Sequence, residues 1–500
     1  MTDRSTVRVC IVGTSRSTWK QRDQPSPEPL AMWEYAARDA IDDIGTASNV
    51  AGELDHLGIV HTQSWNYDDP VARLANRLGC VDASGTYSII AGTSPQRLIN
   101  EAASAMVRGE IGSALIVGAE AQATLRRLEA ANETPDWSHP HPAPTRLEEM
   151  FTEWYLPTEL RHGVLPAWLT FALLSQARWA SRGGRSRDRR SAFEQMSELS
   201  AIAARSDHSW HRTAHSADRL ATPTADNRSI ATPFTKLTTA FPFVDMAAAN
   251  IIVTEEVADR WKVPEEQRVY LRGWGFARDA SHIASRDDMT SSPAMRAATA
   301  GALSMASMTS EEIDVFDLYS CFSSAVQFAS DALDLDADDP RPISLTGGLP
   351  FHGGPGSNYM SHSISALVED LRANPGRSGM VTGIGMHMTK HVAGIWSTAP
   401  GATSLPSQSP PLEMIDDSGT TRKFVRDSAD CVVTIDSASA VYGRDGSPQS
   451  VIAVCSLDDE TRCYARSDDP KVIAIVATDE WVGASARVAA TDDGTNRLLI

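Results

Sequence analysis

The segment SPQRLINEAASAMVRGEIGSALIVGAEA, residues 94–121, places a helix directly before a buried strand. Ser94 is expected to cap the helix, and Pro95 occupies its first turn. Residues 113–121 are almost continuously apolar, which is typical of a strand buried on both faces of a parallel sheet. This segment therefore predicts a layered α/β fold.

The same alternation continues on both sides of this segment. Strands are expected upstream at 7–13, 54–60 and 86–90, with helices at 29–45 and 71–79. Residues 123–240 interrupt the pattern, with helices expected at 165–180 and 191–204, and the sheet resumes within 243–261. A second series follows, with strands at 269–277, 313–320, 379–385 and 392–398, and helices at 295–307, 321–333 and 361–372. Two halves of similar order predict an internal duplication of structure, and one asymmetric sheet is the alternative.

These patterns divide the chain into four parts. The first half spans 1–260 and includes the inserted region 123–240, and the second half spans 261–400. The Pro/Ser-rich residues 401–421 are expected to be a linker. Short β-rich runs in 422–500, including KVIAIVAT at 471–478, predict a small β-barrel.

Composition excludes several classes of function. The net charge of −19 argues against a nucleic-acid partner and an anionic membrane surface. No apolar run is long enough to span a bilayer. Six cysteines without CxxC spacing indicate reduced thiols in the cytoplasm and no structural zinc site.

The segment LTGGLPFHGGPGSNYMSHSI, residues 345–364, is the most informative for chemistry. Glycines and prolines crowd His352 on a constrained loop just before a helix, and α/β sheets bind ligands on such loops. An imidazole there can polarise a carbonyl or exchange a proton near neutral pH. The alternative is a histidine satisfied by turn carbonyls.

GGLPFHGGPGSNY resembles the GHP loop of the thiolase superfamily, whose histidine helps to form an oxyanion hole for a thioester. Four further segments resemble thiolase motifs in the right order over about 400 residues. DLYSCFSSAVQ (317–327) is similar to the HDCF segment of sterol-carrier-protein-type thiolases, and PFVDMAAANIIVTEE (242–256) to the DGAAA strand. AGTSPQRLINEAASAMVRGE (91–110) occupies the place of the nucleophile helix, and TGIGMHMTKHVAGIWS (382–397) that of the final CxG segment.

This resemblance implies a five-layer α/β/α/β/α sandwich of two similar halves. The residues after 421 resemble the oligonucleotide-barrel domain that is attached to, or partners, some thiolase-like proteins. The resemblance also implies a CoA thioester as substrate, no bound cofactor or metal, and association as a homodimer or with a partner protein through the barrel.

The sequence departs from the family at both cysteines of Claisen chemistry. The nucleophile position falls within Ala91–Ser94, which has no cysteine, and the second falls near Thr382 or Gly383. A hydroxyl such as that of Ser94 attacks only when a base is aimed at it, so capping is the favoured role of Ser94.

Other residues suggest a different mechanism. Tyr319 stands where the HDCF histidine would be, and Tyr359 follows the glycine-rich loop. Thiolase-fold retro-aldolases resemble this pattern, because they dispense with the cysteine and use tyrosines for proton transfer. Cys321 is expected at a helix N-terminus, where a thiol pKa is lowered, although a structural role is favoured. His391 is a second acid/base candidate.

Five arginines at 181–190 form a basic run. Arg182, Arg185 and Arg187 could meet CoA phosphates, with Gly353 and Gly354 contributing backbone to the site, and a solvated hinge is the alternative. The predicted function is carbon–carbon bond formation or cleavage on acyl-CoA thioesters, by acyl transfer or by retro-aldol cleavage. A catalytically silent acyl-CoA-binding or scaffold protein is the rival.

Overall fold

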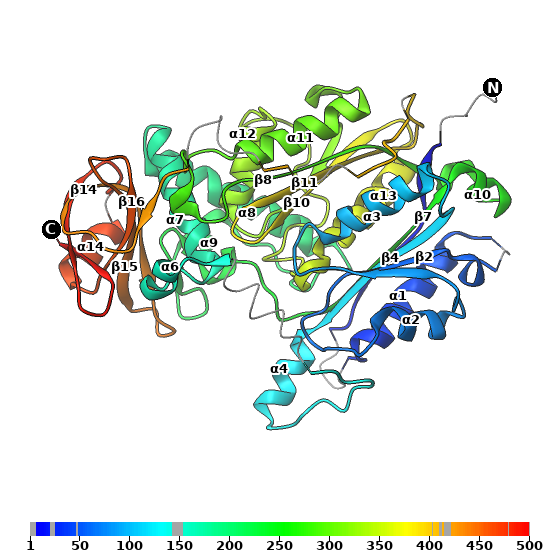
Figure 1. Cartoon of the computed structure of the whole chain (residues 1–500), viewed down its shortest axis with the longest axis horizontal. Coiled ribbons are helices and arrows are strands. Elements are labelled where there is room, and N and C mark those ends of the chain that lie inside the picture. The colour runs from blue at the N-terminus through cyan, green and yellow to red at the C-terminus, as the bar shows by residue number, and fades with distance from the viewer. Residues whose placement is uncertain are drawn as a thin grey trace.

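A computed structural model describes residues 7–20, 26–46, 49–142, 154–402, 404–409, 413–414, 422–478 and 480–499. A large mixed sheet forms the body of the molecule, and a smaller barrel lies at one end (Figure 1). None of the helices in these ranges is both long enough and apolar enough to cross a membrane.

The first half of the sheet has the strand order β3-β2-β4-β7-β1. Its strands are β1 (Val9–Thr18), β2 (His56–Ile59), β3 (Ser84–Tyr87), β4 (Ser113–Ala121) and β7 (Asp245–Thr254). Strand β2 is parallel to β3 and β4, whereas β7 is antiparallel to β4 and β1. The described helices of this half are α1 (Pro29–Asp43), α2 (Pro70–Leu78), α3 (Ser94–Val107) and α10 (Glu255–Arg260).

The second half repeats this arrangement in the order β9-β10-β11-β8. Its strands are β8 (Val269–Arg278), β9 (Val315–Asp317), β10 (Ser378–Gly385) and β11 (Lys390–Ser397). The pairings β9–β10, β10–β11 and β11–β8 have the same directions as β2–β4, β4–β7 and β7–β1. Helices α11 (Pro293–Ala306), α12 (Ser323–Ala332) and α13 (Tyr359–Ala373) accompany them. The predicted duplication is therefore visible in the strand order.

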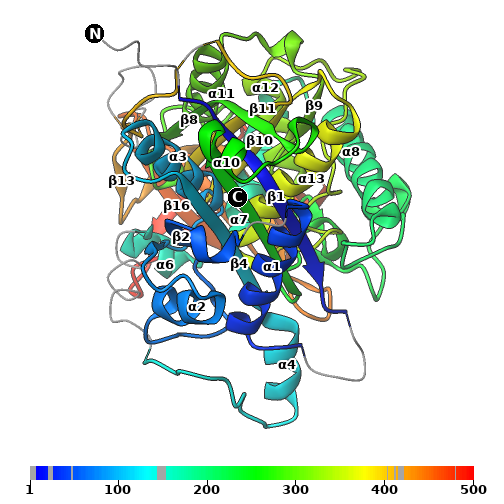
Figure 2. The same cartoon turned by 90° about the vertical axis from the view of Figure 1, so that its right-hand side faces the viewer.

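Side chains alternate between the layers. In β4, Leu115 and Val117 pack toward α1 and α2, whereas Ala114 and Ile116 pack into the core that contains α3 and α13. That middle core also takes Val381 and Val392 from the second half. The order α1/α2, sheet, α3/α13, sheet, α11/α12 can be followed in Figure 1, and Figure 2 looks onto the outer helices of the first half. The predicted five-layer fold is confirmed.

The inserted region contributes helices beside the second half. They are α4 (Gln122–Ala130), α6 (Pro157–His162), α7 (Ala167–Ser181), α8 (Arg185–Arg205) and α9 (Ala217–Ala221). It also contains the short strands β5 (Ser229–Ala231) and β6 (Phe234–Thr235).

Five of the described strands close the C-terminal barrel. They are β14 (Cys431–Tyr442), β15 (Pro448–Ser456), β16 (Arg462–Ser467), β17 (Ser485–Ala490) and β18 (Asn496–Leu499). Pairing runs β14-β15-β16-β18-β17 and back to β14. Strand β5 of the insertion adds to β14 through Ala231 and Val441, and the Ser437 hydroxyl donates to the Leu173 carbonyl of α7 at 2.6 Å. The barrel is therefore packed onto the body.

One predicted barrel strand is wrong. Residues 470–478 form helix α14 (Pro470–Thr478) between β16 and β17. Pro470 opens the helix and the Asp469 carboxylate accepts the Lys471 N–H at 2.8 Å. A short β-branched run has no periodicity that separates a strand from a buried helix, so these local signals decide.

Candidate active site

A cavity of about 350 Å³ lies where the insertion meets the ends of the second-half strands. Trp168 and Phe171 of α7 form one wall, and Ile384 and Met386 at the end of β10 form another. The glycine-rich loop contributes further lining residues, among them Gly354, Gly356 and Ser357. The lining is mostly apolar, with a few polar groups, as in small-molecule sites.

Tyr319 follows β9 and lines this cavity. Its backbone N–H donates to the Thr382 hydroxyl at 2.9 Å, which fixes the residue against β10. Its own hydroxyl has no hydrogen-bond partner among the described residues, although the ring is only 7% exposed. Burial raises the pKa of Tyr319, so its phenol is protonated at neutral pH. The site therefore presents a neutral hydrogen-bond donor.

The Tyr319 hydroxyl occupies the space in front of Gly92. A Cβ atom added at Gly92 would lie 2.6 Å from Tyr319 Oη and 2.2 Å from the Ile384 carbonyl oxygen. Gly92 lies within the segment that resembles the nucleophile helix, so the phenol packs directly against this segment. The neighbouring Ala91 N–H donates to Ser357 Oγ at 3.1 Å and joins this segment to the glycine-rich loop.

Ser94 is not in the cavity lining, and its predicted capping role is wrong. It is the first residue of α3, and its hydroxyl donates to the Ile89 carbonyl at 2.9 Å. The N-cap residue is Thr93, whose side chain makes no capping hydrogen bond. Ser94 instead closes the turn before the helix.

Cys321 contributes a thiol to the cavity lining. It lies two residues before α12 and is 6% exposed. Burial raises the pKa of the Cys321 thiol, with hydrogen bonds to the backbone N–H groups of Phe322 and Cys321 opposing the rise. The expected lowering at a helix N-terminus is therefore wrong, because desolvation outweighs it.

The expected orientation of His352 is also wrong. Its ring is fully buried and does not line the cavity. Nδ1 lies 3.3 Å from Ser209 Oγ, and Nε2 lies 3.3 Å from Nδ1 of His362. Burial, with a smaller contribution from Arg16, holds the pKa of His352 well below its usual value. From this loop, the residues that border the cavity are Leu349, Gly354, Gly356 and Ser357.

Tyr359 stands behind Tyr319 in a polar network. Its ring packs edge-on to that of Tyr319 at 5.4 Å, and its hydroxyl lies 2.6 Å from Thr346 Oγ1. Asp317 Oδ2 accepts the backbone N–H groups of Leu345 and Thr346 at 2.7 and 2.9 Å. This network anchors the glycine-rich loop, and Tyr359 does not line the cavity.

Glu120 is a buried carboxyl beside the cavity that sequence analysis missed. It accepts the N–H groups of Gln63 and Ser64 at 2.8 and 3.0 Å. A Cβ added at Gly356, whose φ is +52°, would lie 2.4 Å from Glu120 Oε1. Burial raises the pKa of Glu120 to about 7, against the lowering effect of these hydrogen bonds. An acidic residue inside the apolar run 113–121 was the available signal.

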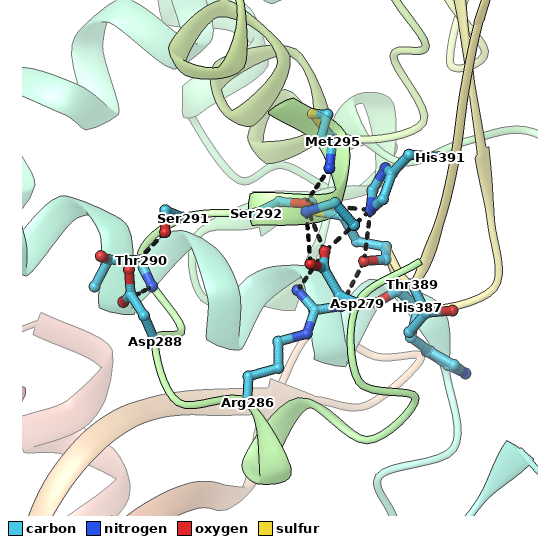
Figure 3. A network of polar contacts seen from close by, with 12 residues as sticks. Asp279, Arg286, Asp288, Thr290, Ser291, Ser292, Met295, His387, Thr389 and His391 are labelled. Atoms are coloured by element: carbon cyan, nitrogen blue, oxygen red, sulfur yellow. Dashed lines mark hydrogen bonds and ion pairs between the residues drawn. The ribbon is translucent and has the colours of Figure 1, made fainter. Parts of the chain in front are cut away.

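The two histidines of the final motif serve separate contacts. His387 Nε2 lies 2.6 Å from Tyr155 Oη and Nδ1 lies 2.8 Å from Thr170 Oγ1. His391 Nε2 lies 3.2 Å from Asp279 Oδ2 and 3.1 Å from the Met388 carbonyl (Figure 3). Neither ring lines the cavity.

The basic run lies at the other end of α7 from the cavity. Arg182 pairs with Asp331 at 2.8 Å, and α7 separates it from Trp168 by about 20 Å at 1.5 Å per residue. The side chains of Arg185 and Arg187 lie outside the described residues.

No model of a known protein family matches the sequence, and no curated protein matches it. Solved structures do match. A monomeric SCP2-thiolase-like protein type 1 from Mycobacterium smegmatis is 29% identical with a TM-score of 0.84, and the match covers 100% of both chains. Human mitochondrial 3-ketoacyl-CoA thiolase in complex with CoA is 16% identical with a TM-score of 0.54, covering 79% of this chain and 98% of that one.

An Ltp2-ChsH2(DUF35) aldolase structure is 15% identical with a TM-score of 0.59, covering 78% of this chain and 97% of that one. The last two matches bear on the fold, and the first extends over body and barrel together. The chain therefore has a thiolase-like fold and is similar along its whole length to an SCP2-thiolase-like protein.

Proposed function

We propose that the protein cleaves a carbon–carbon bond in a β-hydroxyacyl-CoA thioester by retro-aldol chemistry, without an acyl-enzyme. The supporting observation is Tyr319, which lines the cavity and packs its hydroxyl against Gly92 of the segment that resembles the nucleophile helix. This replaces the predicted oxyanion role of His352 with a role for Tyr319.

The reaction needs a proton donor and a proton acceptor but no covalent intermediate. The β-hydroxyl loses its proton, the bond between Cα and Cβ breaks, and its electron pair forms the thioester enolate. Tyr319 relays the proton as this bond breaks: its oxygen takes the proton of the β-hydroxyl while its own proton passes to Cα, so the phenol is neutral before and after the step. The products are a carbonyl compound and a shortened acyl-CoA. A neutral phenol in an apolar cavity also stabilises the enolate oxygen by hydrogen bonding.

The lining supports this assignment over acyl transfer. Acyl transfer by a cysteine needs a thiolate, and the pKa of the Cys321 thiol, which lines the cavity, is raised. The described lining residues include no Lys or Arg, so the cavity suits the acyl group and the neutral pantetheine arm, with the CoA phosphates outside it.

A silent acyl-CoA-binding protein is the second candidate. The described lining residues include no Asp, Glu or His, so a general base other than Tyr319 is lacking there. Glu120, the nearby buried carboxyl, contacts the loop from behind rather than the cavity.

The test is incubation of the full chain with a 3-hydroxyacyl-CoA, with a hydrazine trap for the carbonyl product. The expected result is acetyl-CoA and trapped carbonyl in equal amounts, with an unmodified protein mass. An acyl adduct on Cys321 or Ser94 would instead establish covalent transfer. Saturable binding without product would establish the silent candidate.

A further inference from the structure

The turn between β10 and β11 carries a cavity residue in an unfavourable backbone conformation. Met386 and Met388 have φ values of +59° and +57°, a left-handed region that side chains other than glycine rarely adopt. Met386 lines the cavity. Such conformations persist where surrounding contacts hold them. The shape of this wall therefore depends on what binds the turn.

Arg286 forms hydrogen bonds to the backbone of the turn. The residue is 1% exposed, and its guanidinium donates to the carbonyls of His387, at 3.3 Å, and of Met388. Asp279 Oδ2 lies 3.8 Å from the guanidinium, and the Asp279 N–H donates to the Thr389 carbonyl at 2.9 Å. Figure 3 shows the guanidinium pointing toward Asp279.

The charge of Asp279 stabilises the Arg286 guanidinium in its position against the turn. Burial alone would raise the pKa of Asp279, but Arg286 and His391 lower it to about 2, so the carboxylate stays charged beside the buried guanidinium. Asp279 Oδ2 also accepts the Ser292 hydroxyl at 2.5 Å, and Asp279 Oδ1 accepts the Ala294 N–H at 2.9 Å, which ties the network to the start of α11.

The barrel in turn binds the segment that carries Arg286. Arg462 of β16 is 5% exposed and donates to three backbone carbonyls, those of Ala284, Arg286 and Asp287. Asp436 of β14 holds its guanidinium at 2.6 Å. A continuous path of contacts therefore leads from the barrel through residues 284–287 to the turn and to Met386.

We propose that Arg286 is a positioning residue that holds the turn 386–389 against the cavity, and that Arg462 makes this position depend on the barrel. The barrel then sets the shape of a cavity that it does not line. This role is independent of the reaction at the cavity.

Cys321 provides a readout at the same cavity that needs no substrate. The full-length protein is treated with iodoacetamide, and alkylation of each cysteine is followed by peptide mass spectrometry. Arg462→Met is expected to speed alkylation of Cys321 by roughly tenfold and Arg286→Met by more, since labelling follows the population of locally opened molecules. The double variant should not exceed Arg286→Met alone, because both residues act on one path.

Arg161→Met is the matched control. Arg161 also joins body to barrel, with bonds to the Gly494 carbonyl at 3.0 Å and Asp427 at 2.7 Å, but it does not contact residues 284–287. Cys321 should stay protected in this variant, and Cys10, in the first-half core, should stay protected in all of them.

Unchanged Cys321 labelling in both Arg462→Met and Arg286→Met would overturn the proposal. An equal rise at Cys10 and Cys321 would also overturn it, because it would indicate general unfolding. If Arg286→Met does not fold, Arg462→Lys decides. It keeps the charge but loses the multidentate contact, so intermediate labelling supports the proposal and wild-type labelling contradicts it.

Discussion

The two sides of the glycine-rich loop differ in whether their polar groups border the cavity. On the cavity side, Tyr319 presents a hydroxyl with no described protein partner. On the opposite side, His352 is paired with Ser209 and His362, and Asp317 accepts several donors of the loop. A hydroxyl at a cavity can bind a ligand, whereas groups in a buried hydrogen-bond network stabilise the fold. We call the side with Tyr319 the cavity face and the side with His352 and Asp317 the structural face.

The largest expected effect comes from a substitution on the cavity face, at Tyr319. Tyr319→Phe removes the proposed proton donor and is expected to lower kcat by about 10²- to 10⁴-fold. The melting temperature should stay close to that of the wild type, because the hydroxyl makes no described protein contact. Steady-state kinetics and thermal unfolding check the two parts.

Tyr359→Phe is the matched control from the structural face. It loses the 2.6 Å contact with Thr346 and should cost about 1 kcal/mol of unfolding free energy while kcat changes little. Similar losses of kcat in both variants would contradict the division between the two faces.

Asp317→Asn is expected to have the next largest effect. An amide cannot accept all the donors that converge on Oδ1 and Oδ2, among them Ser363 Oγ at 2.6 Å and Thr346 Oγ1 at 3.0 Å. Loss of charge-assisted hydrogen bonds in a buried network should lower the free energy of unfolding by about 3 kcal/mol. Urea denaturation measures this, and a change below 0.5 kcal/mol, the scale of surface substitutions, would show that Asp317 does not anchor the loop.

The buried pair His352 and His362 predicts a smaller effect, a dependence of the free energy of unfolding on pH. Burial holds the pKa of His352 and of His362 well below 6.5, so the unfolded chain binds more protons as the pH falls below that value. Stability is therefore present above pH 6.5 and is lost as the pH falls. His362→Gln should reduce the slope of unfolding free energy against pH by about 1.4 kcal/mol per pH unit between pH 6.5 and 5. Identical slopes would exclude the pair as its source.

Cys321→Ser should have the smallest effect. The thiol lines the cavity with a raised pKa, and the retro-aldol route does not use it. Turnover is expected to stay within about twofold, since surface and lining substitutions outside the chemistry change little. A hundredfold loss, measured by product formation, would return the mechanism to covalent catalysis.

Much of the fold could be predicted because it depends on local patterns. The alternation around 94–121 and the second alternating series correspond to β4, α3 and the strands of the second half. The run 471–478 was misassigned because helix α14 depends on its first-turn contacts rather than on periodicity.

The site was predicted only in part. Tyr319 and Cys321, both named as candidates from the HDCF-like segment, line the cavity, although a structural role was the favoured prediction for Cys321. The sequence places His352 on the glycine-rich loop, but it does not determine that the ring turns away from the cavity. The ring position depends on contacts with Ser209, from a distant segment, and with His362 at the start of the next helix. The raised pKa values of Cys321 and Glu120 depend on burial, which no local motif reports.

Strand β5, which the insertion adds to the barrel, bears on how the association of body and barrel depends on protein concentration. Body and barrel belong to one polypeptide, so their association is an intramolecular event at a high effective concentration. The contacts between body and barrel, those of β5 and Arg462 included, therefore persist however few molecules are present. Two separate chains making the same contact would lose it once their concentration fell below the dissociation constant.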